Sequence, residues 1–210
     1  MRSTMRSDPK NRPDEYLTLL DWRRRVAGMY AEVRARAASD PVAAHRYWRD
    51  ERNDLFRSHP QSPLSAGERA AFRGLRYFDY NPSLAFTARV RSLSETACEV
   101  ATSAGGSIPF VRFGAVDLPV GTLELMWLDA YGGGLLMPLA DATSGTTTYG
   151  GGRYLLDTVK GADLGSRDGA LVLDFNFAYN PSCAYNGKWL CPLAPAANRL
   201  TVAIEGGERL

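Results

Sequence analysis

The sequence predicts an α+β protein that is mostly β, with two or three N-terminal helices followed by an antiparallel barrel or sandwich of short strands. Apolar residues first recur at helical spacing. From Leu84 onward they alternate with polar residues, and glycine or proline recurs about every ten residues. Short strands with tight turns and no helices between them favour antiparallel sheets over a βαβ arrangement.

Three helices are expected at the start of the chain. The first covers residues 13–37, with Pro13 in its first turn. The Asp40-Pro41 pair predicts the start of a second helix that ends before the His59-Pro60 pair. The capping box from Ser65 to Glu68 predicts a short third helix. The first helix has an apolar stripe of Tyr16, Leu19, Leu20, Val26, Ala27, Tyr30 and Val33.

Strands are expected in the remainder of the chain. Phe86, Ala88 and Val90 alternate with polar residues in the first of them. Leu200, Val202 and Ile204 share one face of the last. The other expected strands lie near residues 96–102, 108–116, 120–130, 134–139 and 169–175, and the last spans 200–205. The sequence thus predicts a disordered tip at 1–12 and a single domain at 13–210, divided into a helical part (13–75) and a β-rich body (84–210).

Composition excludes several classes of protein. The formal net charge is only +2, and the cations are almost all arginines without a basic cluster, so we expect no nucleic acid partner. No apolar run reaches the length of a membrane span or a signal peptide, which predicts a soluble, cytoplasmic protein without membrane contact. Phosphate-loop and dinucleotide-binding motifs are missing from the sequence, so no cofactor is expected.

Two segments, residues 141–154 and 174–185, are unusually rich in polar side chains, glycines and tyrosines. Glycines 150–152 could form a nest of backbone N–H groups for an anion, with Arg153 as a bidentate clamp. The favoured alternative is a turn that needs positive φ. Side chains in these segments that suit ligand binding are Thr143, Tyr149, Arg153, Tyr154, Asn176, Tyr179 and Asn180.

Asp141 and Asp174 are the candidate catalytic residues, because each ends an apolar run and would stand at the rim of a sheet. They could divide acid and base roles if burial separates their pKa values. The favoured alternative is structural, in which each accepts hydrogen bonds from turn N–H groups or pairs with Arg153. His45 and His59 are expected to pack or to cap a helix rather than to serve a catalytic serine.

The cysteines Cys98, Cys183 and Cys191 fit a reducing compartment. Cys183 and Cys191 could be bridged if the backbone folds back, but reduced thiols are favoured, and a buried inert thiol is the default for Cys183. Their spacing is too wide for a zinc knuckle, so no metal site is expected.

The segments around Phe78 to Pro82, 141–154, 174–185, Cys191 to Leu193 and Asn198 to Leu200 resemble the bacterial and archaeal family called domain of unknown function 1684. The resemblance covers roughly Trp48 to the C-terminus and implies no established reaction. This chain departs from the family pattern at Thr147, where an acidic residue is common, at Ala194 and at Ala197. The resemblance implies one cluster made of Asp141, Thr143, Tyr149, Arg153, Tyr154, Asp174, Asn176, Tyr179, Asn180, Cys183, Cys191 and Asn198.

Three functions follow from these residues. The first is binding of a small polar or anionic molecule in a polar cluster around Arg153 and Asp174. The second is a hydrolase or isomerase that uses Asp141 and Asp174 as acid and base. The third is a structural protein that binds a partner through its arginine-bearing helices and takes no ligand.

Overall fold

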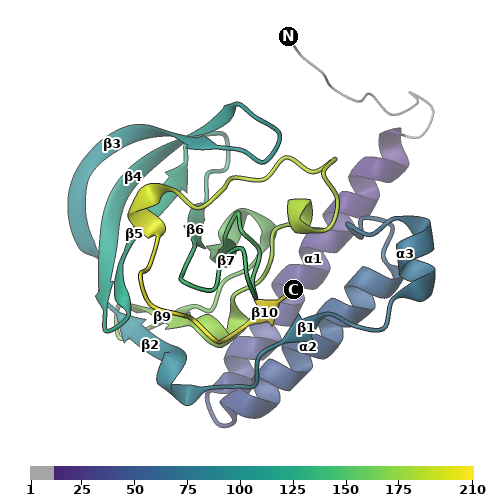
Figure 1. The fold of residues 1–210 in the computed structure, drawn as a ribbon, viewed down its shortest axis with the longest axis horizontal. Coiled ribbons are helices and arrows are strands. Elements are labelled where there is room, and N and C mark those ends of the chain that lie inside the picture. The colour runs from purple at the N-terminus through teal and green to yellow at the C-terminus, as the bar shows by residue number, and fades with distance from the viewer. Residues whose placement is uncertain (1–11) are drawn as a thin grey trace.

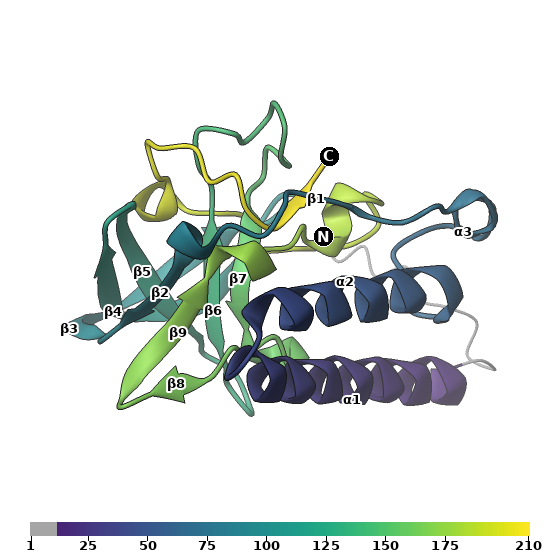
Figure 2. The same cartoon turned by 90° about the horizontal axis from the view of Figure 1, so that it is seen from below.

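The computed structural model describes residues 12–210 and opens with two long antiparallel helices (Figures 1 and 2). Helix α1 spans Arg12–Ala37 and α2 spans Pro41–Ser58. The Asp40 carboxylate caps α2 by accepting from the Ala43 amide at 2.9 Å. Helix α3, Ala66–Ala71, begins with the expected capping box. The three predicted helices are confirmed, while the predicted disordered tip lies outside the described residues except for Arg12.

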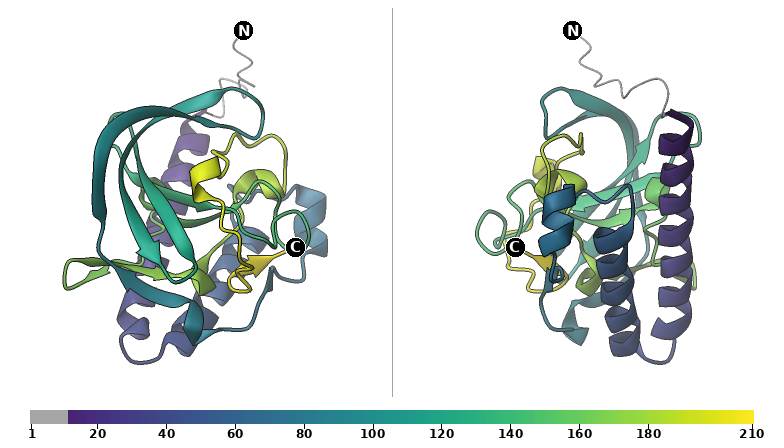
Figure 3. Two further views of the ribbon diagram at one scale, coloured as in Figure 1. Left: turned by 60° about the vertical axis from the view of Figure 1, so that its left-hand side comes forward. Right: turned by 90° about the vertical axis from the view of Figure 1, so that its right-hand side faces the viewer.

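The largest sheet has five strands, each antiparallel to the next along the chain. They are β3 (Arg91–Ala101), β4 (Ser107–Leu118), β5 (Gly121–Leu128), β6 (Leu135–Leu139) and β7 (Arg153–Asp157). Strands β3 and β4 form a long curved hairpin (Figure 3). The first four confirm predicted strands with small changes in their bounds. Strand β7 was not predicted, because it directly follows a glycine run and is buried along its whole length instead of alternating.

Two smaller sheets complete the β part of the described chain. Strand β9 (Ala170–Asp174) lies between β2 (Ala85–Ala88) and β8 (Ser166–Arg167), and β1 (Arg76–Tyr77) pairs with β10 (Glu208–Arg209). All of these pairings are antiparallel. The protein is therefore α+β and mostly β, as predicted, but its described strands do not close into a barrel.

The predicted strand at 200–205 is wrong. Leu200 and Ile204 are buried, but Val202 is 42 % exposed. The backbone of this segment makes isolated hydrogen bonds with the chain around Ala140 instead of a continuous strand ladder. At Ile204 the backbone partners are side chains: its N–H donates to Asp141, and its carbonyl accepts from Arg153. Side chains thus provide the backbone hydrogen bonds that a neighbouring strand would otherwise provide.

Helices α1 and α2 lie side by side along one side of the β body (Figures 2 and 3). Trp48 is fully buried between them and the sheets, and its indole N–H donates to the Tyr30 hydroxyl at 3.2 Å. His45 is also buried, with its ring against Trp48, Tyr77 and Phe177. One apolar cluster contains residues from both helices and from the sheets, so the helices form part of the core.

Candidate functional site

Arg153 lies in the core of the β body, with 1 % of its side chain exposed. Its guanidinium pairs with Asp141 Oδ2 at 2.9 Å and donates to the carbonyls of Ile204, Gly206 and Glu208. These partners tie β7 to the C-terminal segment. These contacts are those of the structural alternative, and they occupy both Nη atoms of Arg153, while its buried Nε has no hydrogen-bond partner.

The preceding glycines form the turn that the sequence favoured over an anion nest. Gly152 has φ of +92°, and a Cβ at this position would lie 2.6 Å from the Leu139 carbonyl oxygen. Asp141 organises the adjoining loop, since its Oδ1 accepts from both the amide and the hydroxyl of Thr143 at 2.8 and 2.6 Å. Thr143 is buried in these contacts.

Asp174 and Asn176 form a second internal network. Asp174 Oδ1 accepts from the amide and the side chain of Asn176 at 3.0 and 2.7 Å, and Oδ2 accepts from the Tyr80 hydroxyl at 3.0 Å. Asn176 in turn bonds both backbone groups of Asn81. Burial raises the pKa of Asp174. This network fastens the loop before β2 to the end of β9.

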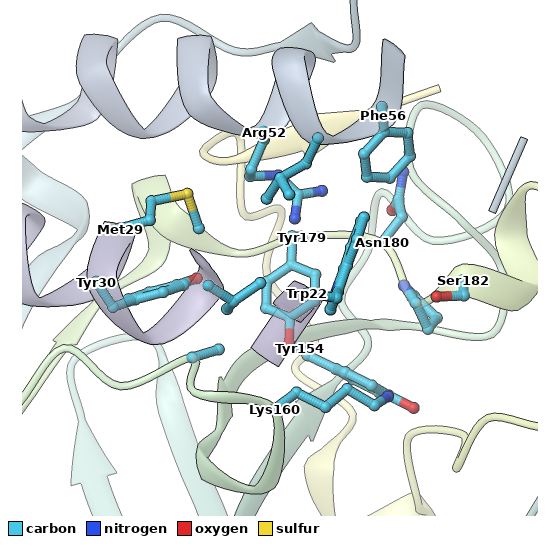
Figure 4. Close-up of a pocket in the computed structure, with 14 residues that line it drawn as sticks. Trp22, Met29, Tyr30, Arg52, Phe56, Tyr154, Lys160, Tyr179, Asn180 and Ser182 are labelled. Carbon is cyan, nitrogen blue, oxygen red and sulfur yellow. The ribbon is translucent and has the colours of Figure 1, made fainter. Parts of the chain in front are cut away.

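Tyr154, Tyr179 and Asn180 have a different setting, because they line a cavity between the helices and the β body (Figure 4). The cavity measures about 50 Å³, which is room for about three to five water molecules. Figure 4 shows Arg52 on the α2 side, Lys160 and Tyr154 on the opposite side, and Tyr179 between them. The wall also includes Trp22, Met29, Tyr30, Phe56 and Ser182.

The charged residues that line this cavity are both cations. Arg52 donates from Nε to the Tyr77 hydroxyl at 3.2 Å and from Nη2 to Glu208 at 2.6 Å. Its Nη1 takes no part in these two hydrogen bonds. Its guanidinium stacks on the Tyr179 ring, with 4.9 Å between the guanidinium carbon and the ring centroid. Lys160 Nζ lies 3.4 Å from Asp157, and the lysine side chain is 46 % exposed.

Uncharged polar groups complete the wall. Asn180 is 4 % exposed, and its Oδ1 has no hydrogen-bond partner. Burial raises the pKa of Tyr30 to about 12 and the pKa values of Tyr154 and Tyr179 further still, so these phenols remain protonated donors. The Tyr154 hydroxyl donates to the Pro192 carbonyl at 2.6 Å.

Lys160 lines this cavity and also two further hollows. One, of about 180 Å³, shares Tyr154 with the cavity and is lined mainly by apolar side chains of the large sheet: Ile108, Phe110, Leu128 and Leu136. The other, of about 220 Å³, shares Trp22 and Ser182 and includes Cys191. A mostly apolar cavity with two cations in its wall and an apolar hollow therefore share one lysine.

The twelve positions that the resemblance grouped lie on connected segments, but their side chains separate. Asp141, Thr143 and Arg153 form one internal network, and Asp174 and Asn176 form another. Tyr149 lies beside Cys183 and Cys191. Asn198 is a brace, since its side-chain amide bonds the backbone of Glu124 and Pro138. Tyr154, Tyr179 and Asn180 remain as the wall of the cavity.

The sequence analysis missed Trp22, Arg52 and Lys160. Arg52 carried a signal, because it continues the buried stripe of α2 four residues after Trp48, where an apolar side chain is expected. Lys160 carried a weaker one, as one of three lysines in an arginine-rich chain. Within residues 12–210 no group of three or more histidine, cysteine or acidic side chains is placed to hold a metal ion.

The fold and the cavity define a class: an α+β protein whose helical hairpin closes a cavity, with two cations in its wall, against antiparallel sheets. The chain belongs to the family described as Protein of unknown function (DUF1684), whose model matches residues 70–209. The resemblance is thereby confirmed, although the match begins later than Trp48. Helices α1 and α2 precede the matched span.

One solved structure with this fold is the solution NMR structure of an uncharacterised protein from Haloarcula marismortui. It shares 32 % sequence identity with this chain, covers 77 % of this chain and 90 % of its own, and has a TM-score of 0.52. No curated protein matches the sequence. None of the helices in residues 12–210 is both long and apolar enough to span a bilayer.

Proposed function

We propose that this protein binds a small organic acid with an apolar tail, with the acid group in the cavity that Arg52 and Lys160 line. The observation that carries the proposal is that two cationic side chains line one cavity whose wall also includes Asn180, a residue whose Oδ1 is buried without a hydrogen-bond partner. The proposed ligand belongs to the expected class, a small polar or anionic molecule. Its proposed site is this cavity and not the surroundings of Arg153 and Asp174.

The cations suit a carboxylate. Arg52 offers Nη1 from a guanidinium that Glu208 and Tyr77 hold in place, so little side-chain entropy is lost when a ligand binds. Lys160 is mobile enough to close over the ligand, since nearly half of its side chain is exposed and its contact with Asp157 is long. The cavity volume of about 50 Å³ fits a group of a few heavy atoms.

The remaining groups define the rest of the ligand. A buried acceptor without a donor costs about 1–3 kcal/mol, so Asn180 Oδ1 calls for a ligand O–H or N–H or for a bound water. An alkyl or aryl tail that leaves the cavity past Tyr154 and Lys160 enters the apolar hollow against Phe110 and Leu136. A 2-hydroxy acid with a medium-length tail provides an acid group for the cations, an O–H donor for Asn180 Oδ1 and an apolar tail for the hollow.

Isothermal titration calorimetry tests the proposal with 2-hydroxyoctanoate and with octane-1,2-diol as the uncharged match. We expect the acid to bind and the diol to bind much more weakly. Loss of one charge-assisted contact costs about 1.5–3 kcal/mol, so Lys160→Met is expected to weaken acid binding about tenfold or more and to leave diol binding unchanged.

Lys188→Met is the matched control, because Lys188 is exposed and lies outside the three hollows around Lys160. It should bind the acid like the wild type. Equal affinity for acid and diol, or equal losses in the two lysine variants, would overturn the proposal.

A further inference from the structure

We propose that Cys183 and Cys191 form a redox pair in which Cys183 reacts with a hydroperoxide and Cys191 then closes a disulfide. The proposal rests on a cluster of side chains outside the ligand cavity and is independent of ligand binding. Both cysteines are free thiols in the structure.

The chain folds back so that the two cysteines meet. Cys183 lies on the short turn Ser182–Ala184, and its backbone N–H donates to Cys191 Sγ at 3.3 Å. Cys191 is held at the end of β3, because its amide donates to the Ser103 hydroxyl at 3.2 Å and its carbonyl accepts from the Ser103 amide at 3.0 Å. A sulfur this close to the backbone of the other cysteine lies within reach of its thiol.

The surroundings favour a thiolate on Cys183. Hydrogen bonding from Cys191, then from Tyr149, lowers the pKa of the Cys183 thiol to about 6 against the opposing effect of burial. The Tyr149 hydroxyl lies 3.6 Å from Cys183 Sγ. Burial raises the pKa of Tyr149 to about 12, so that phenol stays a donor. Cys191 keeps its proton, since the pKa of its thiol is raised by the same contact with Cys183 and by burial.

The two thiols therefore have different roles. Cys183 is half-buried with a lowered thiol pKa, and Cys191 is buried with a raised thiol pKa, next to a hollow that it helps to line. In the first step the Cys183 thiolate attacks the terminal oxygen of a hydroperoxide. An S–O bond forms, the O–O bond breaks, and the other oxygen leaves as water or an alcohol after taking up a proton.

In the second step Cys191 loses its proton, and its sulfur attacks Cys183. The S–S bond forms, the S–O bond breaks, and hydroxide leaves as water with that proton. Both thiols have then lost one electron each to the peroxide, and the balance closes with no further reagent. The Tyr149 hydroxyl stabilises the starting thiolate through a hydrogen bond.

The test is oxidation of the full chain by one equivalent of hydrogen peroxide, followed by alkylation and non-reducing peptide mass spectrometry. Cys98 is an internal control, because it is a half-buried cysteine on β3 outside this cluster. We expect a Cys183–Cys191 disulfide, formed at least about tenfold faster than any oxidation of Cys98, since the thiolate is the reactive form and the pKa of Cys183 is lowered.

Variants separate the two roles. Cys191→Ser should stop at a sulfenic acid on Cys183 that dimedone traps, whereas Cys183→Ser should leave Cys191 reduced. In the reduced wild-type protein, a pH titration followed by thiolate absorbance should show one cysteine that ionises near pH 6. Tyr149→Phe should raise the pKa of that cysteine. Oxidation of Cys98 as fast as Cys183, disulfides only between chains, or no thiolate below pH 8 would each overturn the proposal.

Discussion

Arg153 Nη2 donates to Asp141 Oδ2 at 2.9 Å, and both side chains are essentially inaccessible to solvent. The same guanidinium holds three carbonyls of the C-terminal segment, at Ile204, Gly206 and Glu208. A charged residue that the sequence presents as a ligand clamp is thus a brace between β7 and the end of the chain.

The first prediction concerns this brace. Arg153→Met should destabilise the fold by about 3–5 kcal/mol, because it leaves the buried Asp141 charge without its partner. Urea denaturation followed by circular dichroism measures the loss. The control is Arg91→Met, which breaks an exposed pair with Asp117 and should change stability far less. Comparable losses in both variants would show that Arg153 does not brace the core.

The second prediction concerns Asp174. Because burial raises the folded-state pKa of Asp174, the folded state binds its proton more tightly than the unfolded state does. Stability should therefore fall as pH rises from about 3.9 through the raised pKa of Asp174. Asp174→Asn should lack this decrease, so the variant should gain stability relative to the wild type as pH increases.

Denaturation midpoints from pH 3 to pH 8 check the prediction for Asp174. Asp129→Asn, at an exposed loop position, is the control for the removal of one carboxylate. A constant difference between Asp174→Asn and the wild type over this range would show that the Asp174 carboxyl titrates alike in both states.

The third prediction concerns His45. Burial, followed by the nearby Arg49 charge, lowers the pKa of His45 to about 4. A histidine with a depressed pKa gives stability that is present above its unfolded value of about 6.5 and is lost as pH falls through about 4. The imidazole should therefore remain neutral at pH 5.

NMR titration of the histidine C2–H resonances, assigned with His45→Gln, measures this value. The His45 resonance should hold its neutral shift at pH 5 and move only as the pH approaches 4. Titration near 6.5 would mean that water reaches the ring between Trp48 and Phe177.

Local sequence signals predicted the helices because their causes are local. The Asp40 cap and the capping box at Ser65 act within four residues. Most strands were predicted for the same reason, since alternation and turn residues are neighbours in the chain.

The errors come from contacts between distant segments. The pattern at Leu200 to Ile204 alternates like a strand, but side chains of Asp141 and Arg153 satisfy its backbone. Strand β7 is buried along its whole length and shows no alternation. Whether Arg153 faces solvent or the core depends on the path of residues 204–208, which no local pattern contains.

Only some of the residues that line the cavity were predicted from the sequence, for a related reason. Tyr154, Tyr179 and Asn180 stand in the polar segments that the sequence singled out, whereas Trp22, Arg52 and Lys160 come from the helices and from a turn after β7. Only the packing of the helical hairpin against the β body brings the two sets together.

We propose that an organic acid binds with its acid group in the cavity that Arg52 and Lys160 line. Intermolecular NOEs from 2-hydroxyoctanoate bound to isotope-labelled protein test it most directly. The account predicts NOEs from the proton at carbon 2 to Tyr179 and Trp22, and from the terminal methyl group to Phe110 and Leu136. Binding with NOEs to other surfaces, or with the two ends reversed, would contradict it.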